Sequence, residues 1–97
     1  MCMEGKESKK ERAIITVTGL DHPGIIAAVT KGCADLDINI EDLSQTVVQD
    51  ILTMTLIVDI TGKDLKLLKE RMREVEKEQN VKILVQHEDI FRYMHRI

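Results

Sequence analysis

Aromatic residues are nearly absent from this chain of 97 residues, which has one Phe, one Tyr and no Trp. Sheets that bind single-stranded RNA stack the bases on aromatic side chains, and this chain has almost none to provide such a surface. A net charge of −3 creates no positive field that attracts nucleic acid or an anionic membrane. No apolar run approaches the ~20 residues that span a bilayer, and the charged start lacks the apolar segment of a secretory signal. We therefore expect neither a nucleic-acid nor a membrane partner.

Cysteine is also scarce, and neither of the two cysteines suggests a site. Cys2 lies in the charged start and Cys33 on the apolar side of a predicted helix, so we expect no structural disulfide. This cysteine usage fits the reducing cytoplasm. No Ser/His/Asp or Cys/His arrangement is evident, and the carboxylates are spread over exposed faces. We predict that the protein is not an enzyme and has no cofactor.

A chain of this length is expected to form one domain. Residues 1–11 mix lysines with glutamates, a composition typical of disorder rather than of a binding arm, and we predict a disordered N-terminal tail. Residues 12–97 then form a single domain that includes a C-terminal helix. Its core must be built mainly from aliphatic side chains and methionine, because the only aromatics, Phe91 and Tyr93, lie near the C-terminus.

The apolar pattern predicts an α+β fold. Residues 52–60 alternate as a half-buried strand does, and apolar residues recur at helical spacing in residues 65–79. The predicted elements are, in chain order, a strand at 13–18, a helix at 23–36, strands at 39–47 and 52–60, a helix at 65–79, a strand at 81–86 and a short helix at 89–97. This order predicts the ferredoxin-like βαββαβ sandwich, a four-stranded antiparallel sheet with two helices on one face, plus the short C-terminal helix.

Two features of the predicted fold indicate close packing against another surface. Gly32 lies inside the first predicted helix, where we expect it to allow a close approach of the helix to the sheet. Ile14, Ile57 and Leu84 fall on strand positions opposite to the core, so the second face of the sheet is half apolar. We expect this face to be covered by another copy or by the C-terminal segment.

The turn between the first strand and the first helix, residues 19–26, is the main candidate for a binding site. Pro23 suits the first turn of a helix, and Gly24 has no Cβ to keep a ligand from the backbone. The first N–H groups of the helix have no acceptor within it. Such an end favours an anion, for example the carboxylate of a small ligand. A turn that binds nothing is the alternative.

The sequence of this turn resembles the opening of ACT domains. In that family a strand is followed by Asp/Asn-Arg/His-Pro-Gly and by a helix that begins with two aliphatic residues, and residues 15–26 read ITVTGLDHPGII. After the first helix, Asn39-Ile40 stands where ACT domains commonly have Asn-Ile, whereas Asp37 replaces a usual glycine. Residues 43–54 and 90–97 are similar to short, stand-alone ACT proteins, so the resemblance covers residues 12–97.

The resemblance implies a regulatory domain that binds an amino acid or a similar small effector, as a homodimer or a higher homo-oligomer. In ACT domains the ligand lies between copies, held by the strand-to-helix loop of one copy and the second strand of its neighbour. By position, Asp21, His22 and Gly24 are the implied loop contacts, and Asn39 is the implied contact from the second strand. A structural role is the alternative, with Asp21 capping the helix and Asn39 serving the turn.

Two other functions remain open at the level of the sequence. The free sheet face or edge could bind a partner protein, with no ligand involved. His22, His87 and His95 could form a zinc or nickel site, but no H-x-H or H-x₃-H spacing exists, so the fold or a dimer would have to bring them together. We assign no metal ligand and predict an amino-acid-binding, homodimeric sensor in the cytoplasm.

Overall fold

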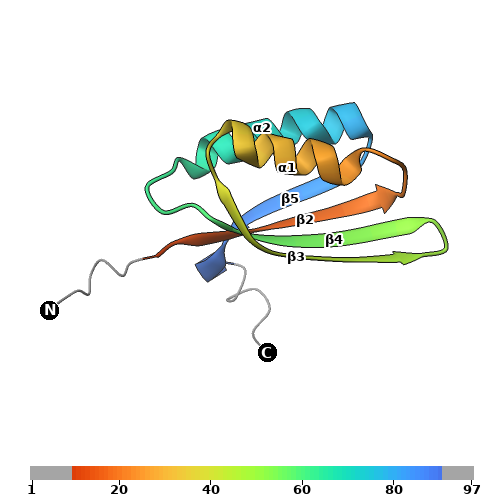
Figure 1. The fold of residues 1–97 in the computed structure, drawn as a ribbon, viewed down its shortest axis with the longest axis horizontal. Coiled ribbons are helices and arrows are strands. Elements are labelled where there is room, and N and C mark those ends of the chain that lie inside the picture. The colour runs from red at the N-terminus through yellow and green to blue at the C-terminus, as the bar shows by residue number, and fades with distance from the viewer. Residues whose placement is uncertain (1–9, 91–97) are drawn as a thin grey trace, which may run out of the picture.

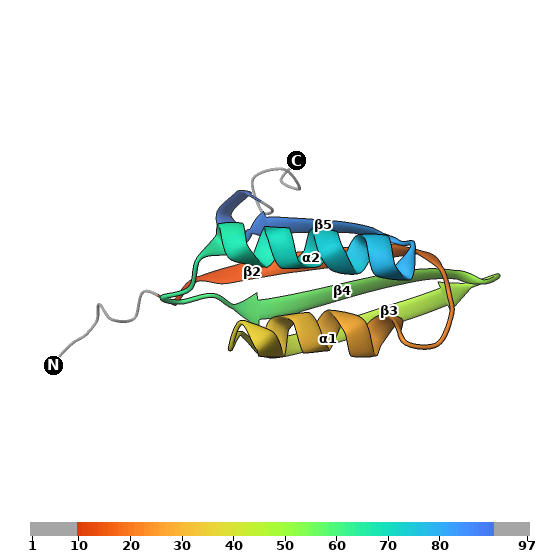
Figure 2. The ribbon, with the colours of Figure 1, turned by 90° about the horizontal axis from the view of Figure 1, so that it is seen from above.

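In the computed structural model, which describes residues 10–90, four antiparallel strands form one sheet and two helices lie on one of its faces (Figures 1 and 2). The elements are β2 (Arg12–Leu20), α1 (Ile25–Asp35), β3 (Asn39–Val48), β4 (Ile51–Asp59), α2 (Leu65–Gln79) and β5 (Lys82–His87). The strand order β3-β4-β2-β5 confirms the predicted ferredoxin-like fold. A short C-terminal helix begins at Glu88, and most of the predicted 89–97 helix lies outside the described residues.

The ends of the helices follow from the backbone conformation of single residues. α2 has the predicted bounds: the Asp64 side chain accepts a hydrogen bond from the Lys66 N–H at 2.9 Å, and Asn80 ends the helix with a left-handed φ of 56°. α1 begins at Ile25, later than predicted, because Gly24 has a φ of 98° that does not belong to a helix. Neither helix within residues 10–90 is long and apolar enough to cross a membrane.

Positive φ angles also mark the tight turns between elements. Gln49 and Asp50 have φ angles of 48° and 73°, the left-handed pair that a two-residue hairpin turn requires. Asp37 has a φ of 58°. Glycine adopts this conformation without cost, and Asp tolerates it better than most residues, which explains how Asp37 can replace the glycine that is usual there.

At the N-terminal end, the domain includes a residue that the sequence pattern assigned to the tail. The Glu11 N–H donates to Thr61 Oγ1 at 2.8 Å, and the Glu11 carbonyl accepts from the Ile60 N–H at 2.9 Å. Glu11 is therefore attached to the loop that follows β4. Residues 1–9 of the predicted tail lie outside the described residues.

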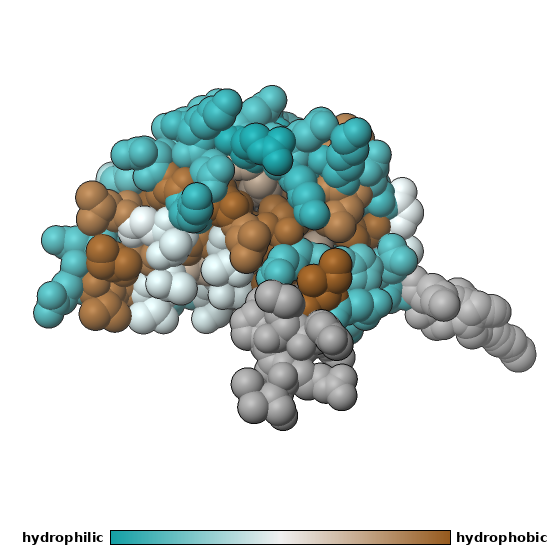
Figure 3. Space-filling view, turned by 180° about the vertical axis from the view of Figure 1, so that it is seen from behind, coloured by the Kyte–Doolittle hydropathy of each residue, from teal (hydrophilic) through white to brown (hydrophobic). Residues whose placement is uncertain are grey.

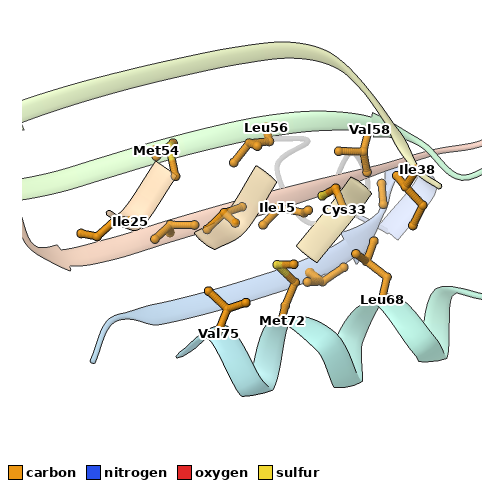
Figure 4. Close-up of a cluster of buried hydrophobic side chains, with 14 of the residues drawn as sticks. Ile15, Ile25, Cys33, Ile38, Met54, Leu56, Val58, Leu68, Met72 and Val75 are labelled. Atoms are coloured by element: carbon orange, nitrogen blue, oxygen red, sulfur yellow. The ribbon is translucent and has the colours of Figure 1, made fainter. Parts of the chain in front are cut away.

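The core lies between the sheet and the helices, with side chains from both layers pointing toward one another (Figure 4). As predicted, the alternate residues of β4 and the residue that follows it are all buried: Leu52, Met54, Leu56, Val58 and Ile60. They meet buried side chains from the other elements, among them Ile15, Cys33 and Met72. Burial raises the pKa of the Cys33 thiol to about 11, so this cysteine stays protonated and unreactive.

Gly32 marks a close contact, but with the other helix. A Cβ at this position would lie 2.7 Å from the Met72 Cε atom and 3.3 Å from the Arg71 Cγ atom of α2. The guanidinium of Arg71 also donates to the Asp35 carboxylate of α1 at 2.6 Å. The expectation that Gly32 approaches the sheet is wrong, because this position lies on the side of α1 that meets α2.

Because Leu56 is fully buried, the Leu56→Ala variant should lose about 2–5 kcal/mol of unfolding free energy through lost burial and a residual cavity. Thr55 is its neighbour in β4, points to the opposite face and is only partly buried, so Thr55→Ala should cost distinctly less. Urea unfolding of both variants beside the wild type measures the two losses. Equal, large losses would contradict the assignment of the core face.

Candidate functional site

The loop of residues 21–24 connects β2 to α1 at the end of the sheet where the β3–β4 hairpin turns (Figure 1). The Asp21 N–H donates to the Asp50 carbonyl at 2.8 Å, which attaches the loop to that hairpin. The His22 ring contacts the Gln79 carbonyl at 2.8 Å, which attaches the loop to the last residue of α2. The loop that carries three of the predicted site residues is thus held by two other elements.

The His22 side chain is surrounded by groups that favour its protonated form. Its Nε2 lies 2.8 Å from the Gln79 carbonyl oxygen and its Nδ1 lies 3.0 Å from the Pro23 carbonyl oxygen. Carbonyl oxygens only accept hydrogen bonds, so both contacts are satisfied only when both ring nitrogens donate. The Gln79 carbonyl, the Pro23 carbonyl and the Asp21 carboxylate raise the pKa of His22 above its usual value of 6.5.

Gly24 is required by backbone conformation rather than by lack of space. It is the N-cap of α1 with a φ of 98°, which residues with side chains rarely adopt, yet a Cβ there would meet only the Gln79 Oε1 atom, at 3.8 Å. The N-cap is therefore Gly24 and not Asp21, and it forms no side-chain cap hydrogen bond. The first hydrogen bond within the helix runs from the Ala28 N–H to the Gly24 carbonyl. The N–H groups of the residues before Ala28 have no acceptor within the helix.

A groove of about 310 Å³ opens beside this loop. It is lined by residues 21–27 and, from the sheet, by Gln45, Val47 and Leu52. The loop and the start of α1 contribute backbone N–H groups, a carboxylate and an imidazole, whereas Ile26, Val47 and Leu52 contribute apolar surface. A groove of this size suits a small molecule, and the mixed walls suit a molecule with a polar and an apolar end.

Asn39 lies away from this groove. It begins β3, paired with Asp59, and at ~3.3 Å per residue it is about 26 Å along the strand from Val47. β3 instead presents Gln45 and Val47 to the groove. The sequence pattern did not single out these two residues, because alternation does not show which end of a strand meets a loop. Asn39 can join the loop residues only from a second copy.

The two described histidines, His22 and His87, lie near opposite ends of β5. His22 contacts Gln79, which precedes β5, whereas His87 is the last residue of β5 and its Nδ1 accepts from the Asp89 N–H at 3.0 Å. His95 lies outside the described residues. Within residues 10–90, no group of three His, Cys, Asp or Glu side chains is placed to hold a metal ion.

A second hollow, of about 200 Å³, lies between α2 and β5. Its wall includes Glu76, whose carboxylate accepts a hydrogen bond from the Ile83 N–H at 2.7 Å. β5 is an edge strand, and an edge strand leaves N–H groups without a strand partner. Glu76 satisfies one of these groups, which explains its position without a ligand.

The fold and the groove define a class of protein, a small ferredoxin-like domain with a ligand-sized groove beside the turn from its first strand to its first helix. The chain belongs to the ACT domain family, whose family model matches residues 11–86. The resemblance seen in residues 15–26 and in Asn39-Ile40 is confirmed by this match.

Similar proteins cover nearly the whole chain. A UPF0237 protein of Methanococcus maripaludis is 47% identical over 89 residues, which are 90% of this chain and 99% of the relative. A UPF0237 protein of Methanopyrus kandleri is 42% identical over 88 residues, which are 89% of this chain and 98% of the relative. The structure of an ACT domain protein from Streptococcus pneumoniae matches with a TM-score of 0.74 at 40% identity, covering 84% of this chain and 93% of that chain.

The contacts of His22 predict a pH dependence of stability. Because folding raises the pKa of His22, its contribution is complete below the unfolded value of about 6.5 and is lost as the pH rises through the folded value. The His22→Ala variant should therefore lose more thermal stability at about pH 5.5 than at about pH 8.5. Melting temperatures of wild type and variant at both pH values test this, and an equal loss at both would contradict it.

Proposed function

We propose that this chain is a homodimeric regulatory protein that binds an amino acid in the groove beside residues 21–27. ACT domains form a regulatory family whose members often bind amino acids. The observation that carries the proposal is the groove, because it combines the uncapped start of a helix with a carboxylate and an apolar wall. A free amino acid has the matching groups, which are a carboxylate, an ammonium and a side chain.

Each part of the groove has a role in this proposal. The first N–H groups of α1 receive the ligand carboxylate, which also suits the positive end of the helix dipole. The Asp21 carboxylate accepts hydrogen bonds from the ammonium group. His22 keeps the loop attached to α2 through its contact with the Gln79 carbonyl. Ile26 and Val47 cover the apolar part of the ligand side chain, and the Gln45 amide offers both a donor and an acceptor.

In this proposal, Asn39 contacts the ligand only when copies of the chain assemble. It lies about 26 Å along β3 from the groove of its own chain, so it contacts a ligand only where a second copy places the start of its β3. A higher homo-oligomer, with a further contact beside β3, accommodates this arrangement. The protein then acts in the cytoplasm as a sensor without catalysis of its own.

A protein-interaction module is the second candidate function. The observation that favours it is a group of exposed apolar side chains near the hairpin, on the face of the sheet that carries no helix: Leu20, Val48 and Ile51. In this case the surface binds a partner protein and no small ligand is involved. The positions of His22 and His87 do not favour the third possibility, a regulator that responds to a metal ion.

A thermal-shift screen of the full-length protein against single amino acids and divalent metal ions tests the proposed function. A ligand that binds only the folded state stabilises it by about 2.7 kcal/mol at about a hundred times its Kd, so the melting temperature rises with concentration. We expect at least one amino acid to act in this way and Zn²⁺ and Ni²⁺ not to. If no amino acid shifts the melting temperature at millimolar concentration, the protein-interaction function takes precedence.

Substitutions in β3 test the position of the ligand. Gln45→Ala should weaken ligand binding by about 1–3 kcal/mol, because it leaves a polar group of the ligand unsatisfied. If the ligand lies between copies, Asn39→Ala should weaken binding by a similar amount for the same reason. Ser44→Ala, next to Gln45 on the opposite face of β3, is the matched control and should bind like the wild type. Isothermal titration calorimetry gives the three affinities, and unchanged binding by Gln45→Ala would contradict the proposed position.

Gly24→Val also tests this position, since it places a side chain where the carboxylate binds, and it should abolish binding. The variant is less informative than Gln45→Ala because a β-branched residue at a φ of 98° strains the loop itself. Circular dichroism is therefore needed to show that this variant is folded.

A further inference from the structure

The edge of the sheet that β5 forms has backbone groups that point away from the sheet. Among residues 10–90, β5 pairs with β2 and with no strand on its other side (Figure 2). Each residue of an antiparallel strand directs its N–H and C=O groups to the same side, and successive residues alternate. Because the Ile83 N–H donates outward to the Glu76 carboxylate at 2.7 Å, the N–H and C=O groups of Ile83 and Val85 all face this edge.

The hollow of about 200 Å³ between α2 and β5 lies along this edge. Its walls include, from β5, Ile83, Leu84 and Val85 and, from α2, Lys69, Arg73 and Glu76. Leu84 points to the face of the sheet that carries no helix and is 55% exposed. Figure 3 views the molecule from the side of α2 and β5, with hydrophilic (teal) side chains above a band of apolar (brown) ones. A chain at this edge therefore meets charged groups on one side and an apolar group on the other.

The side of α2 that borders the hollow carries an excess of positive charge. Its basic residues recur at intervals of three or four: Lys66, Lys69, Arg73 and Lys77. Residues at this spacing share one side of a helix, and Glu70 and Glu76 are the acidic residues among them. Within residues 10–90, no ion pair neutralises Lys69 or Arg73, whereas Arg71 is paired with a carboxylate of α1. In a chain with a net charge of −3, this local positive charge favours a negatively charged partner.

We propose that the β5 edge binds an extended segment of a partner protein in which acidic residues alternate with apolar ones. The segment adds to the sheet as a further strand, so that its backbone bonds to Ile83 and Val85. Successive side chains of a strand lie on opposite faces. The acidic side chains of the segment therefore face Lys69 and Arg73, and its apolar side chains meet Leu84.

Glu76 holds the position that a carbonyl group of the added strand takes. Its carboxylate accepts a hydrogen bond from the Ile83 N–H, as the backbone carbonyl of a neighbouring strand does. The added strand displaces this carboxylate, so one hydrogen bond is lost while the backbone groups of Ile83 and Val85 gain new partners. Glu76 thus protects the free edge against unspecific pairing, and a segment binds only when its contacts exceed those that it replaces.

Other occupants fit this edge less well. A small anion in the hollow would lie beside the Glu76 carboxylate, which repels it. A second copy that adds its own β5 would bring the basic sides of two α2 helices together, and like charges across an interface are unfavourable. Residues 91–97 read FRYMHRI, with two arginines and no acidic residue, so the C-terminal segment does not complement Lys69 and Arg73.

This inference goes beyond the proposed function and does not depend on it. The groove beside residues 21–27 includes Gln45, Val47 and Leu52 of the sheet, and none of its residues borders the hollow between α2 and β5. The β5 edge is also separate from the exposed apolar group near the hairpin. Binding at the edge and binding in the groove can therefore be measured independently.

Charge substitutions in the full-length protein test the side-chain contacts, with a synthetic peptide in which glutamate alternates with valine as the probe. Fluorescence anisotropy of the labelled peptide gives its Kd. The double variant Lys69→Glu/Arg73→Glu should bind at least about tenfold more weakly than the wild type, because two attractive contacts become repulsive. Lys31→Glu is the matched control, since it changes an exposed lysine of α1, and should bind like the wild type. Glu76→Ala should bind more tightly because it frees the Ile83 N–H.

The same peptide with N-methylated backbone amides tests strand addition. It keeps every side chain but cannot donate backbone hydrogen bonds, so it should bind at least about tenfold more weakly. Equal binding of the two peptides would reduce the edge to a surface that attracts anions and would overturn the inference. Equal binding by the double variant and Lys31→Glu, both shown to be folded by circular dichroism, would also overturn it, as would a wild type that does not bind at millimolar peptide. None of these outcomes bears on the amino-acid site, because Lys69 and Arg73 do not line the groove.

Discussion

Burial of one face of β2 and β4 under α1 and α2 is the constraint on which the rest of this structure depends. Successive residues of a strand point to opposite faces, so burying Leu56 and its alternates fixes Thr55 and its alternates on the face of the sheet that carries no helix. A shift of the strand register by one residue would exchange the buried and exposed side chains and expose the whole core. The same alternation therefore produces the packed interior and the threonine-rich surface on the other side of the sheet.

The loop of residues 21–24 carries the candidate site because the sheet and α2 hold it in place. Loops that bind ligands are usually positioned by a rigid scaffold, and here Asp21 is bonded to the hairpin while His22 is bonded to the end of α2. Gly24 supplies the left-handed turn that leaves the start of α1 uncapped. The groove thus requires three elements that are distant in the sequence to meet at one end of the sheet.

The groove lies on the helix-bearing side of the sheet, and it differs in chemistry from the face that carries no helix. The groove combines charged and apolar groups in a small volume, which suits a small molecule with both kinds of group. The helix-free face carries mainly threonine and aliphatic side chains along β2 and β4, with Arg12 and Asp59 at one margin.

The sequence by itself determined the features that depend on residues close together in the chain. Periodicity predicted the element order and the bounds of α2, and three of the predicted site residues, Asp21, His22 and Gly24, are grouped because one turn contains them. Only the tertiary structure decided which distant residues meet that turn. His22 contacts a residue 57 positions away, Gln45 rather than Asn39 reaches the groove, and Gly32 approaches α2. The reason is physical: a local pattern encodes which side of a strand or helix is apolar, whereas strand register and helix packing decide which ends and faces come together.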